Sequence, residues 1–176
     1  VAYDIYFDNF IVGPGMTSQG AAIGPWEDKS TAVLTELTNL TSKSIWMRRV
    51  GDSAEFSISV VASAATGAGD NNVLFDVAQA AIGLTVDETV FTETTTVVGV
   101  GLTDSPSSVF VTVIPRYYTA SNVIAFQKID GLTADNLDGS EFAATEVLKC
   151  RFTVPIAEWK GKGIVPMLAE DNLSEW

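Results

Sequence analysis

The sequence contains no histidine and a single cysteine, Cys150. Without histidine, the chain cannot use Ser-His or Cys-His catalysis, and it lacks a common metal ligand and the commonest general base near neutral pH. A single cysteine forms no intrachain disulfide and no cysteine-based metal site. Cys150 lies in an apolar strand pattern, so we expect a buried, unreactive thiol in a protein made in a reducing cytoplasm.

Basic residues are also few. The chain has 10 Lys and Arg against 22 Asp and Glu, which gives a formal net charge of −12. Nucleic acids and anionic membranes attract proteins through basic side chains, so we expect neither as a partner. The sequence lacks any apolar run of about 18 residues, and we therefore expect no membrane-spanning helix.

Motifs for catalysis and cofactor binding are missing as well. The sequence has no phosphate-binding glycine loop and no dinucleotide fingerprint. Most carboxylates fall in expected turns or on the solvent side of expected strands, so we expect no enzyme activity, no cofactor and no metal. One acidic loop raises calcium as a hypothesis, although a solvated loop is the favoured interpretation. Its oxygen-bearing side chains are Asp130, Asp135, Asn136, Asp138 and Glu141.

The residues that are present favour β-structure. Apolar residues make up 47% of the 176 positions, which suits a globular chain with a core of its own. Within Ser44–Ala62, two strand patterns flank the turn Gly51-Asp52-Ser53 and predict an antiparallel hairpin. The second strand alternates with a period of two, placing Phe56, Ile58 and Val60 on one face and Glu55, Ser57 and Ser59 on the other.

Further strands follow along the chain. Val109–Pro115, apolar on both faces, predicts a central strand, and Thr145–Ile156 alternates cleanly with Cys150 inward. Thr89–Val100 predicts another strand, with Gly99 and Gly101 marking a bulge or bend. Ser30–Leu40 fits a helix or a strand, and its threonines favour the strand.

Eight or so strands at spacings of roughly ten residues predict an all-β fold. We expect an antiparallel β-sandwich, jelly-roll-like, with extended N- and C-terminal arms. Residues 1–40 would form an N-terminal strand and arm, residues 41–159 the sandwich core, and residues 160–176 a C-terminal extension.

Three segments also carry a resemblance to a known family. Trp46–Glu55 (WMRRVGDSAE) resembles the "W-x-R-V-G-D-S-x-E" element of β-rich domains in bacteriophage tail fibres and other virion appendages. Ala81–Asp87 (AIGLTVD) is similar to their "I-x-L-x-x-G-L-T-x-D" segment, and Val154–Trp159 (VPIAEW) to their closing "V-P-I-x-x-W" strand. The three segments occur in the family's order and enclose most of the chain.

The resemblance implies a structural virion protein that forms a homotrimer. Because the chain is a compact domain with arms, we interpret it as a capsid decoration (cement) protein, made in the host bacterial cytoplasm and located on the capsid surface. Its partners would be other copies of itself and the major capsid protein or other virion proteins. Expected subunit or capsid contacts are Tyr3, Phe7, Trp26, Arg48, Arg49 and Trp176.

The alternative is a receptor-binding domain that recognises host-surface glycans. Tyr117 and Tyr118 lie in an expected polar loop, Arg116–Asn122, where exposed aromatic rings can stack on sugars. The favoured interpretation is that one ring packs on the edge of the core and the other lies at a subunit contact. Arg48 and Arg49 are consecutive in a strand, so they should point to opposite faces of the sheet.

Deleting Val1–Pro25 is expected to leave a folded trimer that no longer binds capsids. Arms that become ordered on binding would supply much of the contact area. Light scattering after size-exclusion chromatography measures the trimer, and co-sedimentation with capsids measures binding. Retained capsid binding would contradict the arm model.

Overall fold

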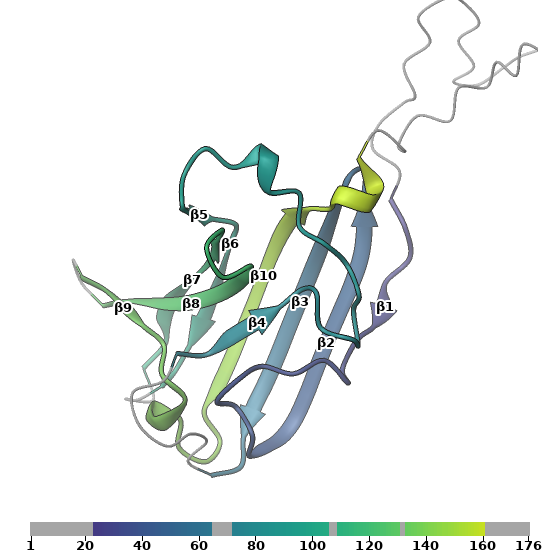
Figure 1. Ribbon diagram of the computed structural model, residues 1–176. Helices are drawn as coiled ribbons and strands as arrows, with labels where there is room; N and C mark the ends of the chain where they lie inside the picture. Colours follow the sequence, from purple (N-terminus) through teal and green to yellow (C-terminus); the bar gives the residue numbers. More distant parts are fainter. Residues whose placement is uncertain (1–22, 65–71, 106–108, 131–132, 161–176) are drawn as a thin grey trace, which may run out of the picture.

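The computed structural model describes residues 23–64, 72–105, 109–130 and 133–160 (Figure 1). The strands are β1 (Glu27–Asp28), β2 (Leu40–Val50), β3 (Ser53–Ala62), β4 (Leu74–Asp76), β5 (Thr95–Val97), β6 (Gly99–Thr103), β7 (Val111–Tyr118), β8 (Val123–Asp130), β9 (Thr133–Asn136) and β10 (Val147–Pro155). The 3₁₀ helices are η1 (Glu88–Val90), η2 (Gly139–Glu141) and η3 (Ala157–Trp159). None of the helices found in these ranges has the length and apolar character needed to cross a membrane.

All ten strands belong to one antiparallel sheet that bends over itself. Its order is β1-β2-β3-β10-β6-β7-β8-β4, with β5 added beside β7 and β9 beside β8. Figure 1 shows β4 crossing in front of β10 and β3. The Phe75 ring of β4 accordingly lies 5.4 Å from Phe56 of β3, although these strands are far apart in the sheet. The bend produces two packed layers and confirms the all-β antiparallel sandwich expected from the sequence.

Four aromatic rings lie at the centre between the two layers. Phe152 of β10 stacks on Phe56 at 5.1 Å and meets Phe75 edge-on at 5.8 Å. Phe126 of β8 contacts Phe152 from the other side at 6.4 Å. All four side chains are buried. Because burying a phenyl group contributes about 1.5–3 kcal/mol, this cluster is a major source of the attraction between the layers.

The β2–β3 hairpin forms as the sequence predicts. Gly51 has a φ of 61°, a conformation that glycine adopts without strain, and the turn occupies Gly51 and Asp52. Phe56, Ile58 and Val60 are buried, and the intervening residues Glu55, Ser57 and Ser59 are only partly buried. The period-two pattern therefore identified the inward face of β3 correctly.

The Ser30–Leu40 segment corrects the sequence prediction, because it forms neither a strand nor a helix before Leu40. Leu34 makes a single bridge to Phe75, and Glu36 has a φ of 63°, which interrupts any extended run. Ala32, Leu34 and Leu37 are buried all the same. The apolar residues that suggested regular structure anchor an irregular segment to the core instead.

The predicted strand Thr89–Val100 is also wrong in part. Its beginning forms η1, and the extended part divides into β5 and β6. Gly99 and Gly101 lie inside β6, where β10 approaches closely. A Cβ atom on Gly101 would lie 2.4 Å from the Cβ of Cys150 and from the carbonyl oxygen of Lys149. These two glycines permit strand contact, whereas the sequence suggested a bulge or bend.

Replacing Gly101 by Ala should lower the free energy of unfolding by about 1–3 kcal/mol, because backbone and core atoms of β10 must move. Gly24→Ala is the control, since its added Cβ would meet Arg49 at an ordinary 3.5 Å. Urea denaturation of both variants measures the effect. Equal stability of the two variants would contradict the close approach of β6 to β10.

Candidate interaction surface

The outward face of β2, β3, β10 and β6 carries a row of side chains in register. Trp46 pairs with Ser57, Ser57 with Arg151, and Arg151 with Val100. Side chains of paired residues lie on the same side of a sheet, so this row crosses four strands. The neighbours of Trp46 along β2, Ile45 and Met47, are buried on the inner face. Alternation and register together place the row on the surface.

A groove of about 370 Å³ lies on this face, lined by Trp26, Trp46, Ser57 and Arg151. Trp26 precedes β1, and its ring lies against two guanidinium groups. The guanidinium carbons of Arg48 and Arg151 are 4.6 Å and 5.5 Å from the ring centre. Cation–π attraction therefore holds the indole over the sheet.

Glu55 forms ion pairs with both Arg48 and Arg151. Its carboxylate lies 2.5 Å from Nε of Arg48 and 3.4 Å from Nε of Arg151. The Glu55 side chain is only 12% exposed, whereas that of Arg151 is 60% exposed. Because two guanidinium groups share one carboxylate, this cluster has a surplus positive charge.

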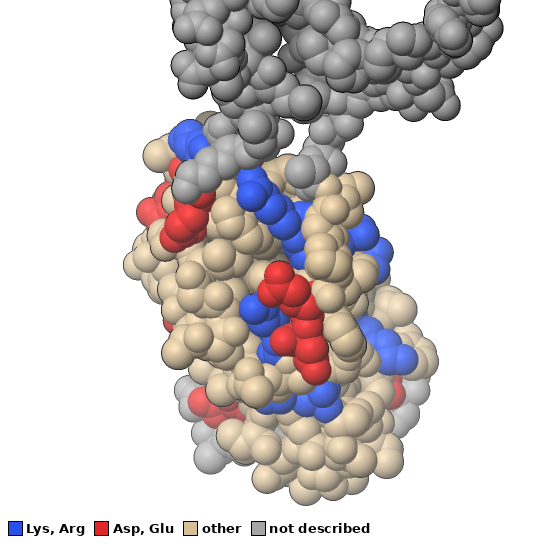
Figure 2. Space-filling model, turned by 90° about the vertical axis from the view of Figure 1, so that its right-hand side faces the viewer, with Lys and Arg blue, Asp and Glu red and all other residues tan. Residues whose placement is uncertain are grey.

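Basic side chains gather on this part of the molecule although the chain carries a net charge of −12. Figure 2 shows several Lys and Arg side chains around a smaller acidic group on one side of the molecule. Lys149 adds a further cation, two residues before Arg151 on the outward face of β10. Arg48, Arg151 and Lys149 thus bring positive charges to the outward face of a chain that is acidic overall.

Arg49 points to the opposite face from Arg48, as the strand geometry predicts. Its Nε donates to the carbonyl oxygen of Gly51 at 2.7 Å, and its guanidinium lies 5.1 Å from the ring centre of Trp159. The contact with Trp159 connects the β2–β3 turn to η3. Contacts of Arg48 and Arg49 with neighbouring subunits stay predictions.

The three segments that resemble virion appendages meet at this turn. The N–H of Ile156 donates to the carbonyl oxygen of Asp52 at 2.8 Å, which joins the third segment to the first. The N–H of Asp87 donates to the carbonyl oxygen of Pro155 at 2.9 Å, and that of Ala157 to Thr85 at 2.9 Å, which join the second segment to the third. Elements far apart in the sequence thus form one junction at the end of the sheet.

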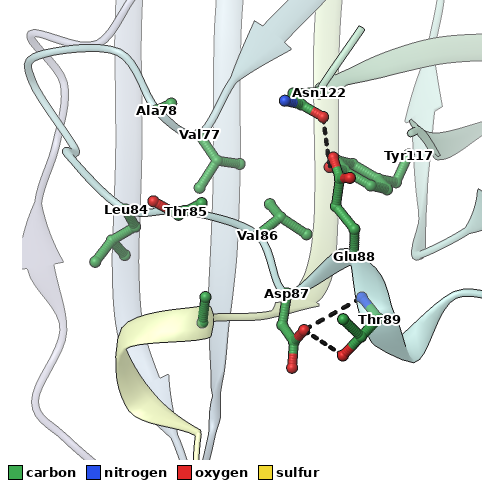
Figure 3. Close-up of a pocket in the computed structure, with 11 residues that line it drawn as sticks. Val77, Ala78, Leu84, Thr85, Val86, Asp87, Glu88, Thr89, Tyr117 and Asn122 are labelled. Carbon is green, nitrogen blue, oxygen red and sulfur yellow. Dashed lines mark hydrogen bonds between the residues drawn. The ribbon is translucent and has the colours of Figure 1, made fainter. Parts of the chain in front are cut away.

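A second cavity, also about 370 Å³, lies beside this junction (Figure 3). On one side, the Asp87 carboxylate accepts hydrogen bonds from the hydroxyl and N–H of Thr89 at 2.6 and 3.2 Å and pairs with Nζ of Lys160 at 2.9 Å. These partners, the Thr89 hydroxyl first, lower the pKa of Asp87 below its ordinary value. The Asp87 carboxylate therefore connects η1 to Lys160, which follows η3.

The other side of this cavity holds Tyr117, Glu88 and Asn122 together (Figure 3). The Tyr117 hydroxyl donates to Oε1 of Glu88 at 2.9 Å, and the Asn122 amide lies 3.2 Å from the same hydroxyl. Burial and the hydrogen bond to Glu88 raise the pKa of Tyr117. Because these polar groups bind one another, the cluster connects η1 to β7.

Tyr117 therefore cannot contact a glycan as the sequence interpretation allowed. Its ring is 0% exposed and belongs to β7, because the strand continues through the expected loop at Arg116. Tyr118 ends β7, is half-buried, and accepts a hydrogen bond from Nε2 of Gln127 at 3.2 Å. Apolar packing against Phe91, 4.9 Å away, is the role of the Tyr117 ring.

The acidic loop gives calcium no support. Asp135, Asn136, Asp138 and Glu141 line a common pocket, but the Lys128 ammonium group lies in it and pairs with Glu141. Within the described residues, no three His, Cys, Asp or Glu side chains are grouped so that they could hold a metal ion.

The expectation of a buried thiol is met, since Cys150 is buried and burial raises its pKa.

Of the six expected contact residues, the structure brings Trp26 and Arg48 together at the groove. Tyr3, Phe7 and Trp176 lie outside the described residues. Sequence reasoning missed Trp46, Ser57 and Arg151 as a set. Alternation along each strand shows which way each side chain points, but only the register of β2, β3 and β10 makes them neighbours.

Comparisons with known proteins leave the family open. No family model and no curated protein matches the chain. Among solved structures, the chain is similar to the crystal structure of the Dettilon tailspike protein, with a TM-score of 0.48 and 17% sequence identity. The match covers 78% of this chain and 23% of the tailspike chain, so this chain spans about a quarter of that protein. A likeness at this level does not assign a function.

Replacing Asp87 by Asn should make stability less dependent on pH on the acid side. A carboxylate with a lowered folded pKa stabilises above its unfolded pKa of about 3.9, and this stabilisation is lost as pH falls through the folded pKa. The difference in urea midpoint between wild type and Asp87→Asn should be largest near neutral pH and disappear in strong acid. Glu93→Gln, at an exposed position, is the control. A difference independent of pH would contradict the role of Asp87.

Proposed function

We propose that this chain is a structural protein of a bacteriophage virion and that it acts as a homotrimeric capsid decoration protein. The resemblance of three segments to virion appendages supports the virion part of the proposal. The three segments hydrogen-bond to one another at one junction, so they form a single structural unit although they are far apart in the sequence. The junction would have a structural role, and other virion proteins would bind the outward face of the sheet.

One observation carries the proposed assembly: an apolar patch made of Val97, Val100, Leu102 and Phe110. These side chains are between 48% and 62% exposed. Val100 and Leu102 alternate outward from β6, and Leu102 pairs with Thr112 of β7, two residues after Phe110. Exposed apolar side chains on neighbouring strands are typical of contacts with other proteins. The patch therefore offers a surface for another subunit or for the capsid.

A decoration protein stabilises a capsid by adding buried area across the joints between capsomers. Each few hundred Å² of apolar contact contributes several kcal/mol at about 25 cal/mol/Å², before the costs of association are subtracted. The net charge of −12 would keep decorated particles soluble and mutually repelling. The apolar patch would supply the buried contact with the capsid, and the acidic remainder of the domain would supply the repulsion between particles.

The second candidate function is a receptor-binding domain for host-surface glycans. The observation that favours it is the groove between Trp26 and Trp46, because aromatic walls with polar groups beside them suit sugars. Tyr117 no longer supports this function, since its ring is buried.

Co-sedimentation with capsids that lack the protein, run beside binding to host cells, tests the proposal. We expect saturable capsid binding at a stoichiometry that matches the lattice symmetry, and a trimer by light scattering. Leu102→Asp should weaken capsid binding or trimer formation about tenfold or more, because it places a charge in a contact that excludes water.

The control is Ser42→Asp, which adds the same charge at an exposed position of β2, with β3 and β10 between it and β6. Binding to cells but not to capsids would favour the receptor-binding function. A folded Leu102→Asp protein that assembles and binds like wild type would contradict the role of the apolar patch.

A further inference from the structure

We propose that the groove lined by Trp26, Trp46, Ser57 and Arg151 binds a saccharide unit that bears a carboxylate group. The ligand class is a glycan containing an acidic sugar. This inference rests on the second candidate function and deepens it by naming the class of sugar. It does not depend on capsid decoration, because a single subunit forms the groove.

The size of the groove suits a small ligand. Its volume of about 370 Å³ falls in the lower part of the range of about 300–1,000 Å³ that is usual for small-molecule sites. Its lining is mostly apolar, with a hydroxyl from Ser57 and a guanidinium from Arg151. A largely apolar wall with a few placed polar groups is the usual composition of a site that orients a ligand.

Both indole rings are held in place before any ligand arrives. Trp46 is 41% exposed, and its Nε1 donates to the Ser44 hydroxyl at 2.8 Å, so the ring needs no further polar partner. Trp26 is fixed by the guanidinium groups of Arg48 and Arg151. The electron-rich face of an indole attracts the C–H groups on the apolar side of a pyranose ring. Fixed rings reduce the entropy lost on binding.

Arg151 supplies the preference for negative charge. Glu55 lies nearer to Arg48, at 2.5 Å, than to Arg151, at 3.4 Å, and the Arg151 side chain is 60% exposed. A planar guanidinium can form two parallel hydrogen bonds with a carboxylate. The Arg151 fork is therefore available to a carboxylate in the groove, and its register partner Ser57 places a hydroxyl beside it.

The surrounding charges favour one carboxylate over a polyanion. Lys149 adds a positive charge on the same face of β10. Asp28 of β1, the register partner of Trp46, adds a negative charge next to Trp46. The Asp28 carboxylate accepts a hydrogen bond from the N–H of Ser30 at 2.8 Å. A nucleic acid would bring many phosphates to a chain with a net charge of −12 and would be repelled. A sugar with one carboxylate can pair with Arg151 and brings much less repulsion from the acidic chain.

The test is titration of the full chain with three acidic probes that carry one carboxylate each: the methyl glycosides of galacturonate, glucuronate and mannuronate. The neutral methyl glycosides of galactose, glucose and mannose are titrated in parallel. Isothermal calorimetry measures affinity, and indole fluorescence reports whether the tryptophans sense the ligand. We expect saturable binding of at least one acidic probe, about tenfold or more tighter than its neutral counterpart.

Variants locate the site. Trp46→Ala and Arg151→Gln should each weaken binding about tenfold or more, and Arg151→Lys should restore only part of it because lysine lacks the planar fork. The controls are Phe110→Ala, an exposed aromatic residue outside the groove, and Lys128→Gln, which removes one charge from β8 at a different pocket. Both should bind within about twofold of wild type. Thermal melts confirm that every variant is folded.

Several outcomes would overturn the inference. These are no saturable binding of any acidic probe, equal affinity for the neutral methyl glycosides, or folded Trp46→Ala and Arg151→Gln proteins that bind like wild type. Tighter binding of a single-stranded oligonucleotide in the same assay would also overturn it. Because no capsid is present, failure here leaves the decoration function unaffected, and loss of capsid binding leaves the saccharide site unaffected.

Discussion

The position of β10 between β3 and β6 is the constraint on which the rest of the structure depends. Its inward residue Phe152 contacts rings from both layers of the core. Its outward residue Arg151 lies between the groove and β6. The strand fits there because Gly101 and its neighbour Gly99 have no side chain where the β10 backbone approaches. Core, surface and junction are thus fixed by one strand pairing.

The outward face of the sheet has two kinds of surface side by side. Arg151 borders the groove and pairs in register with Val100, a member of the apolar patch. The apolar patch suits a protein partner, since its side chains lose unfavourable contact with water on burial. The groove suits a small polar ligand, because its rings are already fixed and its charge is only partly neutralised. A protein seated on the patch would therefore lie next to the groove.

The acidic residues near η1 have structural roles. Asp87 holds Lys160 and Thr89, and Glu88 accepts the hydrogen bond of the buried Tyr117. A buried hydroxyl without a partner costs free energy, so Glu88 stabilises the placement of the Tyr117 ring. Two adjacent carboxylates thus connect the loop before β5 to Lys160, which follows η3, and to Tyr117 of β7.

The sequence by itself determined the all-β class, the β2–β3 hairpin and the inward faces of β3 and β10, because a period of two reports which side of a strand is buried. Local pattern failed at Ser30–Leu40 and at Tyr117. There, a left-handed Glu36 and the length of β7 depend on contacts with distant strands. The groove was decided only by tertiary structure, since Trp46, Ser57 and Arg151 become neighbours through the register of three strands. A sequence pattern shows toward which face of the sheet each side chain points, but the register of strand pairing determines which side chains are its neighbours.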